Sequence, residues 1–449
     1  MIMTAKEYVE KVIEDVKKRD EYDVEFIQAV EEVLTSLVPF IEKNPQYIES
    51  NLLARMCEPE RQIVFRVPWE DDNGNVQVNR GFRVQFNGAI GPYKGGLRFH
   101  PAVKIGTMKF LAFEQTFKNS LTGLPIGGGK GGSDFNPIGK SDNEIRRFCE
   151  SFMTELYRHI GPDVDVPAGD IGVTGKEIGY LYGHYRRIKG AFENGVLTGK
   201  NINFGGSLIR PEATGYGVTY FVQEILNDMG ESIVGKTVAV SGYGNVAWGV
   251  CKKVTDLGGK VVTISEKDGY IYVPEGLSKE QVEYMLYLRA HTELTLKDYA
   301  EKFGIKYIEG RKPWEQKVDI VIPCAIQNEL NLEDAKQILA NGVKVVCEAA
   351  NMPCTPEAIE LFDANKIPHA PGKAANAGGV AVSALEMSQN SMRYQWTAEE
   401  VDAKLHQIMK GIYAKAKAMS IEYNTTLAAG ANIAGFKKVA DAMLAQGIY

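Results

Sequence analysis

The sequence predicts an α/β protein of two domains, an N-terminal α/β domain followed by a domain built on a parallel, doubly wound sheet. The chain has 449 residues, which is too long for one ordinary hydrophobic core. After residue 205, short apolar runs alternate with helical stretches, and closely spaced glycines (Gly242-Tyr243-Gly244) follow the first run. We therefore expect residues 1–204 to form the first domain and residues 205–424 the second.

The first domain is expected to begin with an amphipathic helix, because Thr4 and Glu7 form a capping box ahead of apolar residues at helical spacing. Apolar residues alternate with others over 63–67 and again over 82–86, and Asp71–Gly74 between them is typical of a turn. These two segments are predicted to be strands joined by a hairpin-like connection. Helices are predicted over Met108–Leu121 and Asn143–Ile160.

In the second domain, the apolar runs are typical of strands that are buried on both faces of a parallel sheet. The predicted strands are Thr237–Ser241, Lys260–Ser265, Val318–Ile322 and Val343–Cys347. Thr397 and Glu400 form a second capping box, which opens a long helix. Residues 425–449 have a helical pattern, and we expect this C-terminal helix to return to the first domain and pack on it.

Composition excludes several classes of function. The net charge of −6 disfavours a general nucleic-acid-binding protein, and no apolar run is long enough to span a membrane. The first residues are rich in Lys, Glu and Asp, so no signal peptide is expected. The six cysteines include no C-x-x-C pair and are interpreted as reduced thiols of a cytoplasmic protein. Cys324 and Cys347, at the ends of predicted strands, are interpreted as packing residues.

Candidate catalytic residues lie in glycine-rich segments of the first domain. Lys94 lies in GPYKGG and Lys130 in GGGKGG, while Lys118 lies between them. Glycine beside lysine is typical of a close approach of backbone or ligand, and a desolvated lysine suits acid/base work or carboxylate binding. Asp170 ends the segment PAGD in a further tight turn, whereas Asp163 and Asp165 are interpreted as loop carboxylates. The pattern indicates an enzyme that acts on an acidic small molecule.

The segment TVAVSGYGNVA has the features of a Rossmann-type dinucleotide-binding turn. Gly242 would permit the tight turn, Gly244 the approach of a pyrophosphate, and Ala247 the packing of helix on strand. The following helix would present its N-terminus, at Asn245 and Val246, to phosphate.

The acidic residue at the end of the next predicted strand, Glu266, favours NAD, because a carboxylate there accepts from ribose hydroxyls and repels a 2′-phosphate. Lys267 and Arg289 oppose this preference, so NADP stays the alternative. The six histidines are scattered, His159 and His291 are interpreted as surface residues, and we expect no metal site.

Taken together, these residues resemble the small hexameric glutamate dehydrogenases of the Glu/Leu/Phe/Val dehydrogenase family. The resemblance covers nearly the whole chain and rests on long, ordered blocks: FRVPWEDDNG, GPYKGG, LPIGGGKGG, PAGDIGV, RPEATGYG, SGYGNVAWG, ANMP and NAGGVAVSALEMSQNS. It implies reversible oxidative deamination of L-glutamate to 2-oxoglutarate and ammonium with hydride transfer to NAD or NADP. It also implies a homohexamer, assembled through the first domain, that serves amino-acid metabolism and nitrogen assimilation.

The resemblance assigns a role to each matching residue. Lys130 would activate the attacking water and Asp170 would transfer protons, while Lys118 would hold the α-carboxylate. Lys94 and Ser383 would bind the γ-carboxylate. The remaining assignments place Gln115 and Asn376 beside the substrate, and Arg210, Thr214 and Asn351 near the nicotinamide half of the coenzyme.

The chain also departs from the family pattern. Ile326 stands where threonine is usual, Ala384 where glycine is usual, and Ile126 where methionine is usual. Related enzymes that use NADP tend to carry a basic residue at the position of Thr292, so this residue strengthens the expectation of NAD.

Two other functions stay open from the sequence. One is a dehydrogenase of an apolar amino acid of the leucine or phenylalanine type, which Lys94 disfavours because a buried lysine without an anion is costly. The other is a non-catalytic binding protein on the same fold. The retention of Lys118, Lys130 and Asp170 together argues against that possibility.

Overall fold

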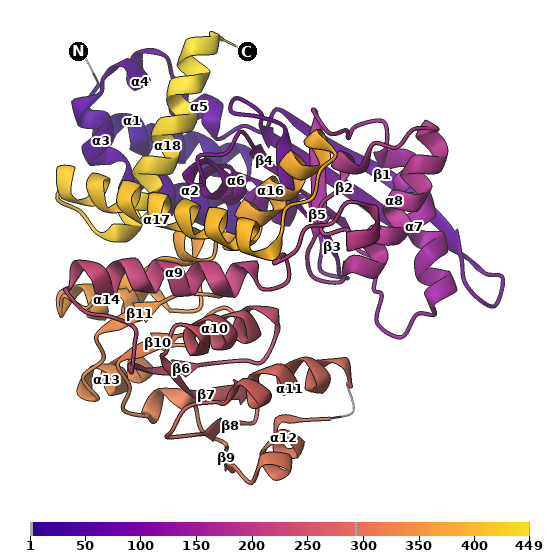
Figure 1. The fold of residues 1–449 in the computed structure, drawn as a ribbon. Coiled ribbons are helices and arrows are strands. Elements are labelled where there is room, and N and C mark those ends of the chain that lie inside the picture. Colours follow the sequence, from indigo (N-terminus) through magenta and orange to yellow (C-terminus); the bar gives the residue numbers. More distant parts are fainter. Residues whose placement is uncertain (1–2, 292–293, 449) are drawn as a thin grey trace.

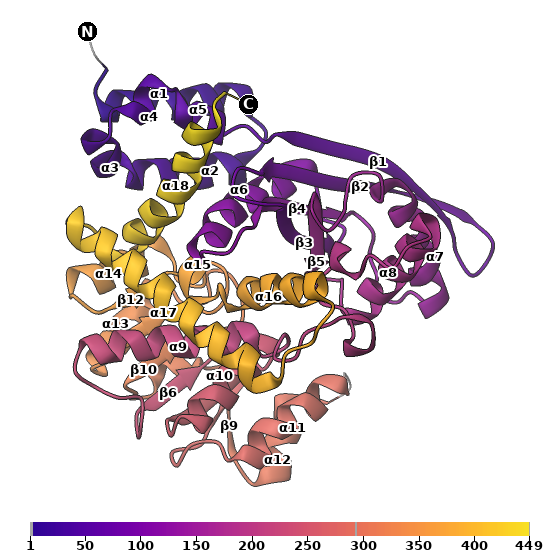
Figure 2. The ribbon, with the colours of Figure 1, turned by 45° about the horizontal axis from the view of Figure 1, so that its top comes forward.

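The computed structural model describes residues 3–291 and 294–448, which form an α/β protein with two separate sheets (Figure 1). One sheet has five strands in the order β1-β2-β4-β3-β5, and the other has seven in the order β12-β11-β10-β6-β7-β8-β9. Figure 2 shows the first sheet beside the N-terminal helices and the second sheet among the helices of the other half.

Five helices open the chain and pack on one another through apolar faces. The capping box of Thr4 and Glu7 is present at the start of the first helix, as the sequence predicts. These helices are α1 (Ala5–Arg19), α2 (Val24–Ser36), α3 (Val38–Lys43), α4 (Gln46–Glu49) and α5 (Leu52–Met56).

The five-stranded sheet begins with the predicted hairpin, whose strands pair antiparallel from Arg61↔Gln85 to Glu70↔Val76. Strand β4 runs antiparallel to β2 and parallel to β3, which in turn is parallel to β5. The strands are β1 (Arg61–Glu70), β2 (Val76–Asn87), β3 (Tyr93–Phe99), β4 (Gly127–Ser133) and β5 (Asp165–Gly169). Helices α6 (Ile105–Leu121), α7 (Asp142–Leu156) and α8 (Gly175–Lys189) pack on the sheet, and the short turns η1 (Asn194–Val196) and η2 (Ile202–Phe204) follow.

The segment GGGKGG is a fully buried strand, β4, between β2 and β3. Its glycines let neighbouring backbones approach, because a Cβ at Gly128 would lie 2.0 Å from the Thr116 hydroxyl oxygen. A Cβ at Gly95 on β3 would lie 1.6 Å from the carbonyl oxygen of Gly129. The close approach that these glycines predict is therefore present, and it brings the Lys130 and Lys94 strands side by side.

The seven-stranded sheet contains the four predicted strands in a parallel arrangement. Two strands that the sequence does not predict extend one edge, and both pair antiparallel. The strands are β6 (Thr237–Val240), β7 (Lys260–Glu266), β8 (Gly269–Tyr272), β9 (Lys306–Glu309), β10 (Ile320–Ile322), β11 (Val345–Cys347) and β12 (His369–Ala370). The sheet is therefore doubly wound with an antiparallel edge, rather than parallel throughout.

Helices flank this sheet and bury its apolar residues in two hydrophobic clusters. They are α9 (Ala213–Asp228), α10 (Asn245–Asp256), α11 (Lys279–Ala290), α12 (Leu296–Phe303), α13 (Leu332–Ala340), α14 (Pro356–Ala364) and α15 (Gly372–Ala375), with the single turn η3 (Pro313–Glu315).

Three helices end the chain: α16 (Gly378–Met392), α17 (Ala398–Glu422) and α18 (Leu427–Gln446). The predicted capping box of Thr397 and Glu400 is present at the start of α17. Helix α18 lies among the N-terminal helices in Figure 1, and Phe436 packs against Phe40 with ring centroids 5.9 Å apart. The division into residues 1–204 with 425–449 and residues 205–424 stays a prediction.

The helices of residues 3–291 and 294–448 include none that is long and apolar enough to cross a membrane. All six cysteines are free and buried, which agrees with the interpretation of Cys324 and Cys347 as packing residues. His159 and His291 are only partly exposed, so they are more buried than the surface positions that the sequence analysis expects. Thr292, on which part of the coenzyme argument rests, lies outside the described residues.

Candidate active site

A cavity of about 430 Å³ gathers all the candidate catalytic and substrate-binding residues. Strands β3, β4 and β5 deliver their residues from one side, while α16 and the segment before α9 deliver theirs from the other. The candidate residues along its wall are Lys94, Gln115, Lys118, Lys130, Asp170, Arg210, Thr214, Val246, Asn351, Asn376 and Ser383. Residues that lie far apart in the sequence therefore share one site.

Lys130 and Asp170 form an ion pair inside this cavity, with Lys130 Nζ 2.8 Å from Asp170 Oδ2. Arg98 Nε donates to the same carboxylate oxygen at 3.0 Å. Burial lowers the pKa of Lys130, and the charge of Asp170 opposes that shift. Burial alone would raise the pKa of Asp170, but the charges and hydrogen bonds of Lys130 and Arg98 prevail and hold this pKa at about 2. Asp170 is therefore ionised at neutral pH while Lys130 stays paired with it.

Lys118, which is part-buried, supplies a second ammonium to the cavity and donates a short hydrogen bond to Asn376 Oδ1. Burial, together with the positive charge of Lys130, lowers the pKa of Lys118 to about 8. Gln115, one turn earlier on α6, donates to Asn119 Oδ1 at 2.6 Å. Because the Lys118 ammonium has lost part of its hydration, an anionic ligand would stabilise its charged form.

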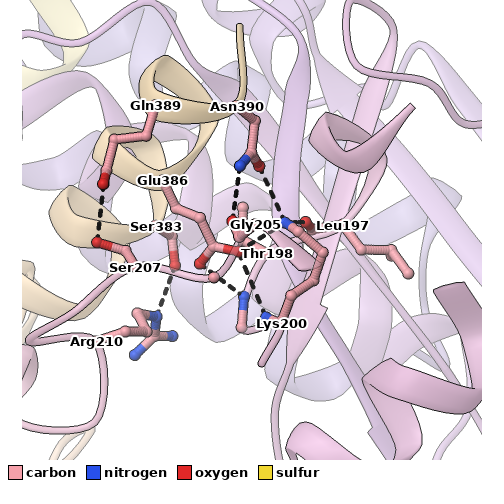
Figure 3. Close-up of polar contacts among 12 residues, drawn as sticks. Leu197, Thr198, Lys200, Gly205, Ser207, Arg210, Ser383, Glu386, Gln389 and Asn390 are labelled. Atoms are coloured by element: carbon pink, nitrogen blue, oxygen red, sulfur yellow. Dashed lines mark hydrogen bonds and ion pairs between the residues drawn. The ribbon is translucent and has the colours of Figure 1, made fainter. Parts of the chain in front are cut away.

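Lys94 supplies the third ammonium of the cavity, and it is only 1% exposed. Its Nζ donates to the Thr198 hydroxyl at 2.8 Å, and no ion pair of Lys94 occurs within the described chain. Burial, followed by the positive charge of Arg210, holds the pKa of Lys94 well below its usual value. Ser383 shares this part of the site, and its hydroxyl accepts from Arg210 Nε at 2.9 Å (Figure 3).

Asn376 links the lysines to the coenzyme side of the site. Its Nδ2 donates to Asn351 Oδ1 at 2.9 Å and to the carbonyl oxygen of Ala349 at 3.2 Å. Because its Oδ1 accepts from Lys118, the Asn376 side chain bridges helix α6 and the segment after β11. Thr214 borders the same cavity from the start of α9.

A second cavity of about 800 Å³ adjoins the first, since Cys324 and Ala325 border both. The predicted dinucleotide turn forms one wall: Gly242 has a φ of +74°, and its N–H donates to Ser265 Oγ at 3.0 Å. Gly244 borders the cavity and caps α10, whose first residue, Asn245, is exposed. An exposed helix N-terminus that faces a groove of this size fits a dinucleotide phosphate.

The last two residues of the dinucleotide turn, Val246 and Ala247, lie on helix α10. Ala247 is buried in α10, and Val246 reaches the catalytic cavity. Gly215 on α9 faces this helix so closely that a Cβ would lie 2.5 Å from the Val246 carbonyl oxygen. Gly215 on α9 and Gly249 on α10 therefore let these two helices approach closely, whereas the packing of Ala247 against the strand stays a prediction.

Glu266 lies at the end of β7 and borders the second cavity, as the sequence predicts. Its carboxylate accepts from the Tyr307 hydroxyl at 2.9 Å and from the N–H of Leu296 at 3.1 Å. These two bonds fix the carboxylate in the groove. Lys267 and Arg289 border the same groove, so the opposing charges that the sequence indicates are present as well.

Of the three departures from the family pattern, Ile326 borders one of these cavities. Ile326 borders the coenzyme groove and is 68% exposed, so an apolar surface takes the place of a hydroxyl there. Ala384 is buried next to Ser383 on α16, and Ile126 is buried directly before β4.

The interpretation of Asp165 as a loop carboxylate is wrong. Asp165 opens β5, is fully buried and pairs with Arg83, whose Nε donates to its Oδ2 at 2.9 Å. Sequence reasoning also missed Arg98, Thr198 and the buried pair of Lys200 with Glu386. The pattern of lysine beside glycine that singles out Lys94 and Lys130 recurs at Gly199-Lys200, so a signal for that pair existed.

Three side chains that could bind a metal come together although their sequence spacing gives no such indication: Glu348, Cys354 and His369. The Glu348 carboxylate accepts from the N–H of Gly372 at 2.8 Å and from the N–H of Cys354 at 3.3 Å. His369 Nε2 lies 3.5 Å from Glu348 Oε1. The Glu348 carboxylate therefore already accepts two hydrogen bonds from the backbone.

Comparisons with known proteins agree with this geometry. Residues 205–447 match the family model of Glutamate/Leucine/Phenylalanine/Valine dehydrogenase, and residues 59–187 match that of the Glu/Leu/Phe/Val dehydrogenase dimerisation domain. The chain is 60% identical to the NAD-specific glutamate dehydrogenase of Clostridium symbiosum over 447 residues, which cover 98% of this chain and 99% of that protein.

It is 57% identical to the NADP-specific glutamate dehydrogenase of Haemophilus influenzae over 437 residues, which cover 97% of each protein. A solved glutamate dehydrogenase structure superimposes with a TM-score of 0.96 at 60% identity, covering 98% of this chain and 99% of that one. On these grounds the chain belongs to the Glu/Leu/Phe/Val dehydrogenase family.

Proposed function

We propose that the protein is a glutamate dehydrogenase, which converts L-glutamate reversibly to 2-oxoglutarate and ammonium. The observation that carries this proposal is the pair of ammonium groups of the buried Lys94 and the part-buried Lys118, in one cavity beside Lys130 and Asp170. Two separate cations fit a substrate with two carboxylates, because each buried charge needs its own anion. Several relatives that are more than half identical are glutamate dehydrogenases, which supports the same activity.

Each residue has a definite role in the proposed reaction. Lys118 binds the α-carboxylate, and Lys94 with Ser383 binds the γ-carboxylate, so the substrate length is fixed between them. Gln115 and Asn376 orient the amino-acid end, and the Asn376 bridge ties it to the coenzyme side. The nicotinamide coenzyme supplies the hydride acceptor in deamination.

Proton transfer falls to Lys130 and Asp170. Lys130, with its lowered pKa, activates the water that attacks the iminium carbon. Lys130 accepts a proton from this water and gives it to Asp170, and as Lys130 becomes neutral again, one of the two charges that lower the pKa of Asp170 is lost. Asp170 then becomes a better proton acceptor and passes the proton toward the departing ammonia.

The coenzyme proposed is NAD, with NADP as the alternative. The groove beside Gly242 and Gly244 fits a pyrophosphate, while the fixed carboxylate of Glu266 favours a free ribose 2′-hydroxyl. Arg210, Thr214 and Asn351 border the inner cavity, where the nicotinamide end would enter. Related proteins include NAD-specific and NADP-specific enzymes, so the choice rests on the residues of this groove.

We further propose a cytoplasmic homohexamer assembled through the first domain, with neither nucleic acid nor a membrane as partner. The family model that matches residues 59–187 is that of a dimerisation domain, which supports self-association. The net charge of −6 is consistent with a soluble metabolic enzyme rather than a nucleic-acid-binding protein. A mass measurement in solution that finds a monomer at working concentration would contradict this assembly.

The direct test of the proposed activity follows the absorbance of the reduced nicotinamide. L-Glutamate, L-leucine and L-phenylalanine are each mixed with the enzyme and either NAD or NADP, and the reverse direction is run with 2-oxoglutarate and ammonium. We expect coenzyme reduction with glutamate and NAD. Faster turnover of an apolar amino acid would favour the alternative dehydrogenase, and no turnover in either direction would favour a binding protein.

A further inference from the structure

A buried ion pair next to the cavity joins the segment before α9 to helix α16. Lys200 Nζ lies 2.7 Å from Glu386 Oε1, and both side chains are fully buried. Neither residue borders the cavity that gathers Lys94 and Ser383. Figure 3 shows the pair between the segment 197–207 and the same face of α16 that carries Ser383.

Glu386 holds the backbone of residues 197–200 as well as the lysine. Its Oε2 accepts from the N–H of Gly199 at 3.0 Å, and its Oε1 accepts from the N–H of Lys200 at 3.4 Å. Lys200 Nζ donates in addition to the carbonyl oxygen of Leu197 and, at 3.0 Å, to Asn390 Oδ1. The Glu386 carboxylate and the Lys200 ammonium therefore hold the backbone of residues 197–200 in a closed loop.

The residue inside this loop is Thr198, whose hydroxyl accepts from Lys94 Nζ at 2.8 Å. The N–H of Thr198 donates to the carbonyl oxygen of Pro167 on β5 at 3.0 Å. Thr198 is therefore fixed between β5 and α16, and it is the hydrogen-bond acceptor that aims the Lys94 side chain. Loss of the Glu386 contacts would remove the hydrogen bonds from α16 to the backbone of residues 199 and 200 and leave Lys200 with Asn390 as its partner on that helix.

The charges around Lys94 support the same role for Glu386 as the hydrogen bonds do. The charged groups that act most strongly on Lys94 come from three surrounding elements: Arg83 on β2, Arg210 and Lys200 before α9, and Glu386 on α16. Glu386 is the single anion of this set and favours the charged form of Lys94, whereas the three cations oppose it. Without that anion, Lys94 would lose its proton more readily.

We propose that Glu386 and Lys200 are positioning residues for the pocket that receives the distal carboxylate of the substrate. The pair holds Thr198 and the Ser383 helix in register, so that Lys94 is aimed before the substrate enters. This inference rests on the proposed function, because it assumes a substrate with a carboxylate at the end opposite the amino group.

Glu386→Gln tests the pair, since glutamine keeps the size of the side chain but removes its charge. Its amide nitrogen would also place a donor against the N–H of Gly199 or the Lys200 ammonium. The readout compares kcat and KM for L-glutamate with those for L-norvaline, which has the same carbon chain without the distal carboxylate. We expect KM for glutamate to rise about tenfold or more, with kcat/KM for norvaline changed by less than about twofold.

The pH profile is a second readout that a loss of stability alone would not move. Removal of the Glu386 charge should shift the alkaline limb of kcat/KM for glutamate to lower pH, because Lys94 deprotonates earlier. The limb for norvaline should stay in place, since norvaline makes no use of Lys94.

Asp402→Asn is the control, because Asp402 accepts from Lys253 Nζ at 2.8 Å in a second, part-buried pair that borders neither the catalytic cavity nor the coenzyme groove. It should lower the melting temperature and leave the glutamate-to-norvaline ratio unchanged. If Glu386→Gln behaves like this control, or matches the unmodified enzyme in both KM and pH profile, the positioning role is wrong. If the unmodified enzyme does not turn over glutamate, the proposed function is wrong instead.

If Glu386→Gln fails to fold, Glu386→Asp tests the positioning role instead. Aspartate keeps the charge but is one methylene shorter, so it cannot reach both the Lys200 ammonium and the backbone N–H of Gly199. We expect a raised KM for glutamate with the alkaline limb near its original position. A KM for glutamate equal to that of the unmodified enzyme would overturn the proposal.

Discussion

Lys130 Nζ lies 2.8 Å from Asp170 Oδ2, so the proposed water-activating base and the proposed proton carrier already touch without a ligand. Lys130 comes from β4 and Asp170 directly follows β5, on either side of β3 in the sheet. The two groups therefore titrate as a pair, in which the loss of the lysine proton makes the carboxylate more basic. This coupling gives the first prediction.

Asp170→Asn should lower kcat for glutamate by about 10² or more while the binding of the coenzyme stays nearly unchanged. Asparagine keeps the size and polarity of the side chain but carries no proton between water and ammonia. Steady-state kinetics together with fluorescence titration of the reduced coenzyme checks both parts. Asp163→Asn, at an exposed position outside the catalytic cavity, is the control and should leave kcat unchanged. A kcat for Asp170→Asn equal to that of the unmodified enzyme would remove Asp170 from the mechanism.

Lys118 should make the binding of the α-carboxylate depend on pH. Burial and Lys130 lower the pKa of Lys118 to about 8, so its charge is present below that pH and is lost above it in the free enzyme. The dissociation constant of 2-oxovalerate, which has only the α-carboxylate, should therefore rise about tenfold per pH unit above that value. Titration with enzyme and reduced coenzyme between about pH 6.5 and about pH 9.5 measures it.

Lys118→Arg is the matched variant for this pH dependence, because an arginine side chain stays protonated over the whole range. Its dissociation constant for 2-oxovalerate should stay flat where that of the unmodified enzyme rises. A profile with the same rise in both proteins would assign the ionisation to another group.

Glu266→Gln should reduce the preference for NAD over NADP by about tenfold or more, measured as the ratio of kcat/KM values with glutamate. The amide keeps an acceptor for the Tyr307 hydroxyl but no longer repels a 2′-phosphate, and Lys267 and Arg289 remain to attract it. Glu309→Gln on the adjoining β9, an exposed partner of Lys297, is the control for a general change of charge. An unchanged ratio in Glu266→Gln would show that Glu266 does not select the coenzyme.

Asp165→Asn should destabilise the protein strongly without touching the reacting groups. It would leave the Arg83 guanidinium buried without its anion, which typically costs about 3–5 kcal/mol. The temperature of half inactivation should fall clearly, whereas Glu10→Gln, which breaks an exposed pair with Lys6, should change it little. Equal inactivation temperatures for Asp165→Asn and the unmodified protein would show that the Arg83–Asp165 pair does not stabilise the fold.

The fold was predictable from the sequence wherever residue types alternate or recur at a regular spacing. The hairpin, the capping boxes of Thr4 and Thr397, and the parallel strands of the second sheet all follow from such patterns. Strand β4 was not recognised as a strand because five of its seven residues are glycine, which has low strand propensity and offers no alternation. Its burial between neighbouring strands, a tertiary effect, overrides that propensity.

The site was predictable to the extent that its residues lie in glycine-rich segments. Lys94, Lys130 and Asp170 were found in this way, and the structure brings them into one cavity. Asp165 was missed, because only the fold shows that Arg83 meets it in the interior. The same holds for Glu386, which is separated from Lys200 by 186 residues in the sequence.

The central claim is that Lys94 selects a substrate with a second carboxylate, and the measurement that tests it compares kcat/KM for L-glutamate and L-norvaline in the unmodified enzyme and in Lys94→Leu. Lys104→Leu, an exposed lysine outside the cavity, is the control. We predict that the unmodified enzyme and the control prefer glutamate by about 10² or more. Lys94→Leu should lose that preference, because an apolar side chain cannot pair with the γ-carboxylate. Full kcat/KM for glutamate in Lys94→Leu would contradict the account.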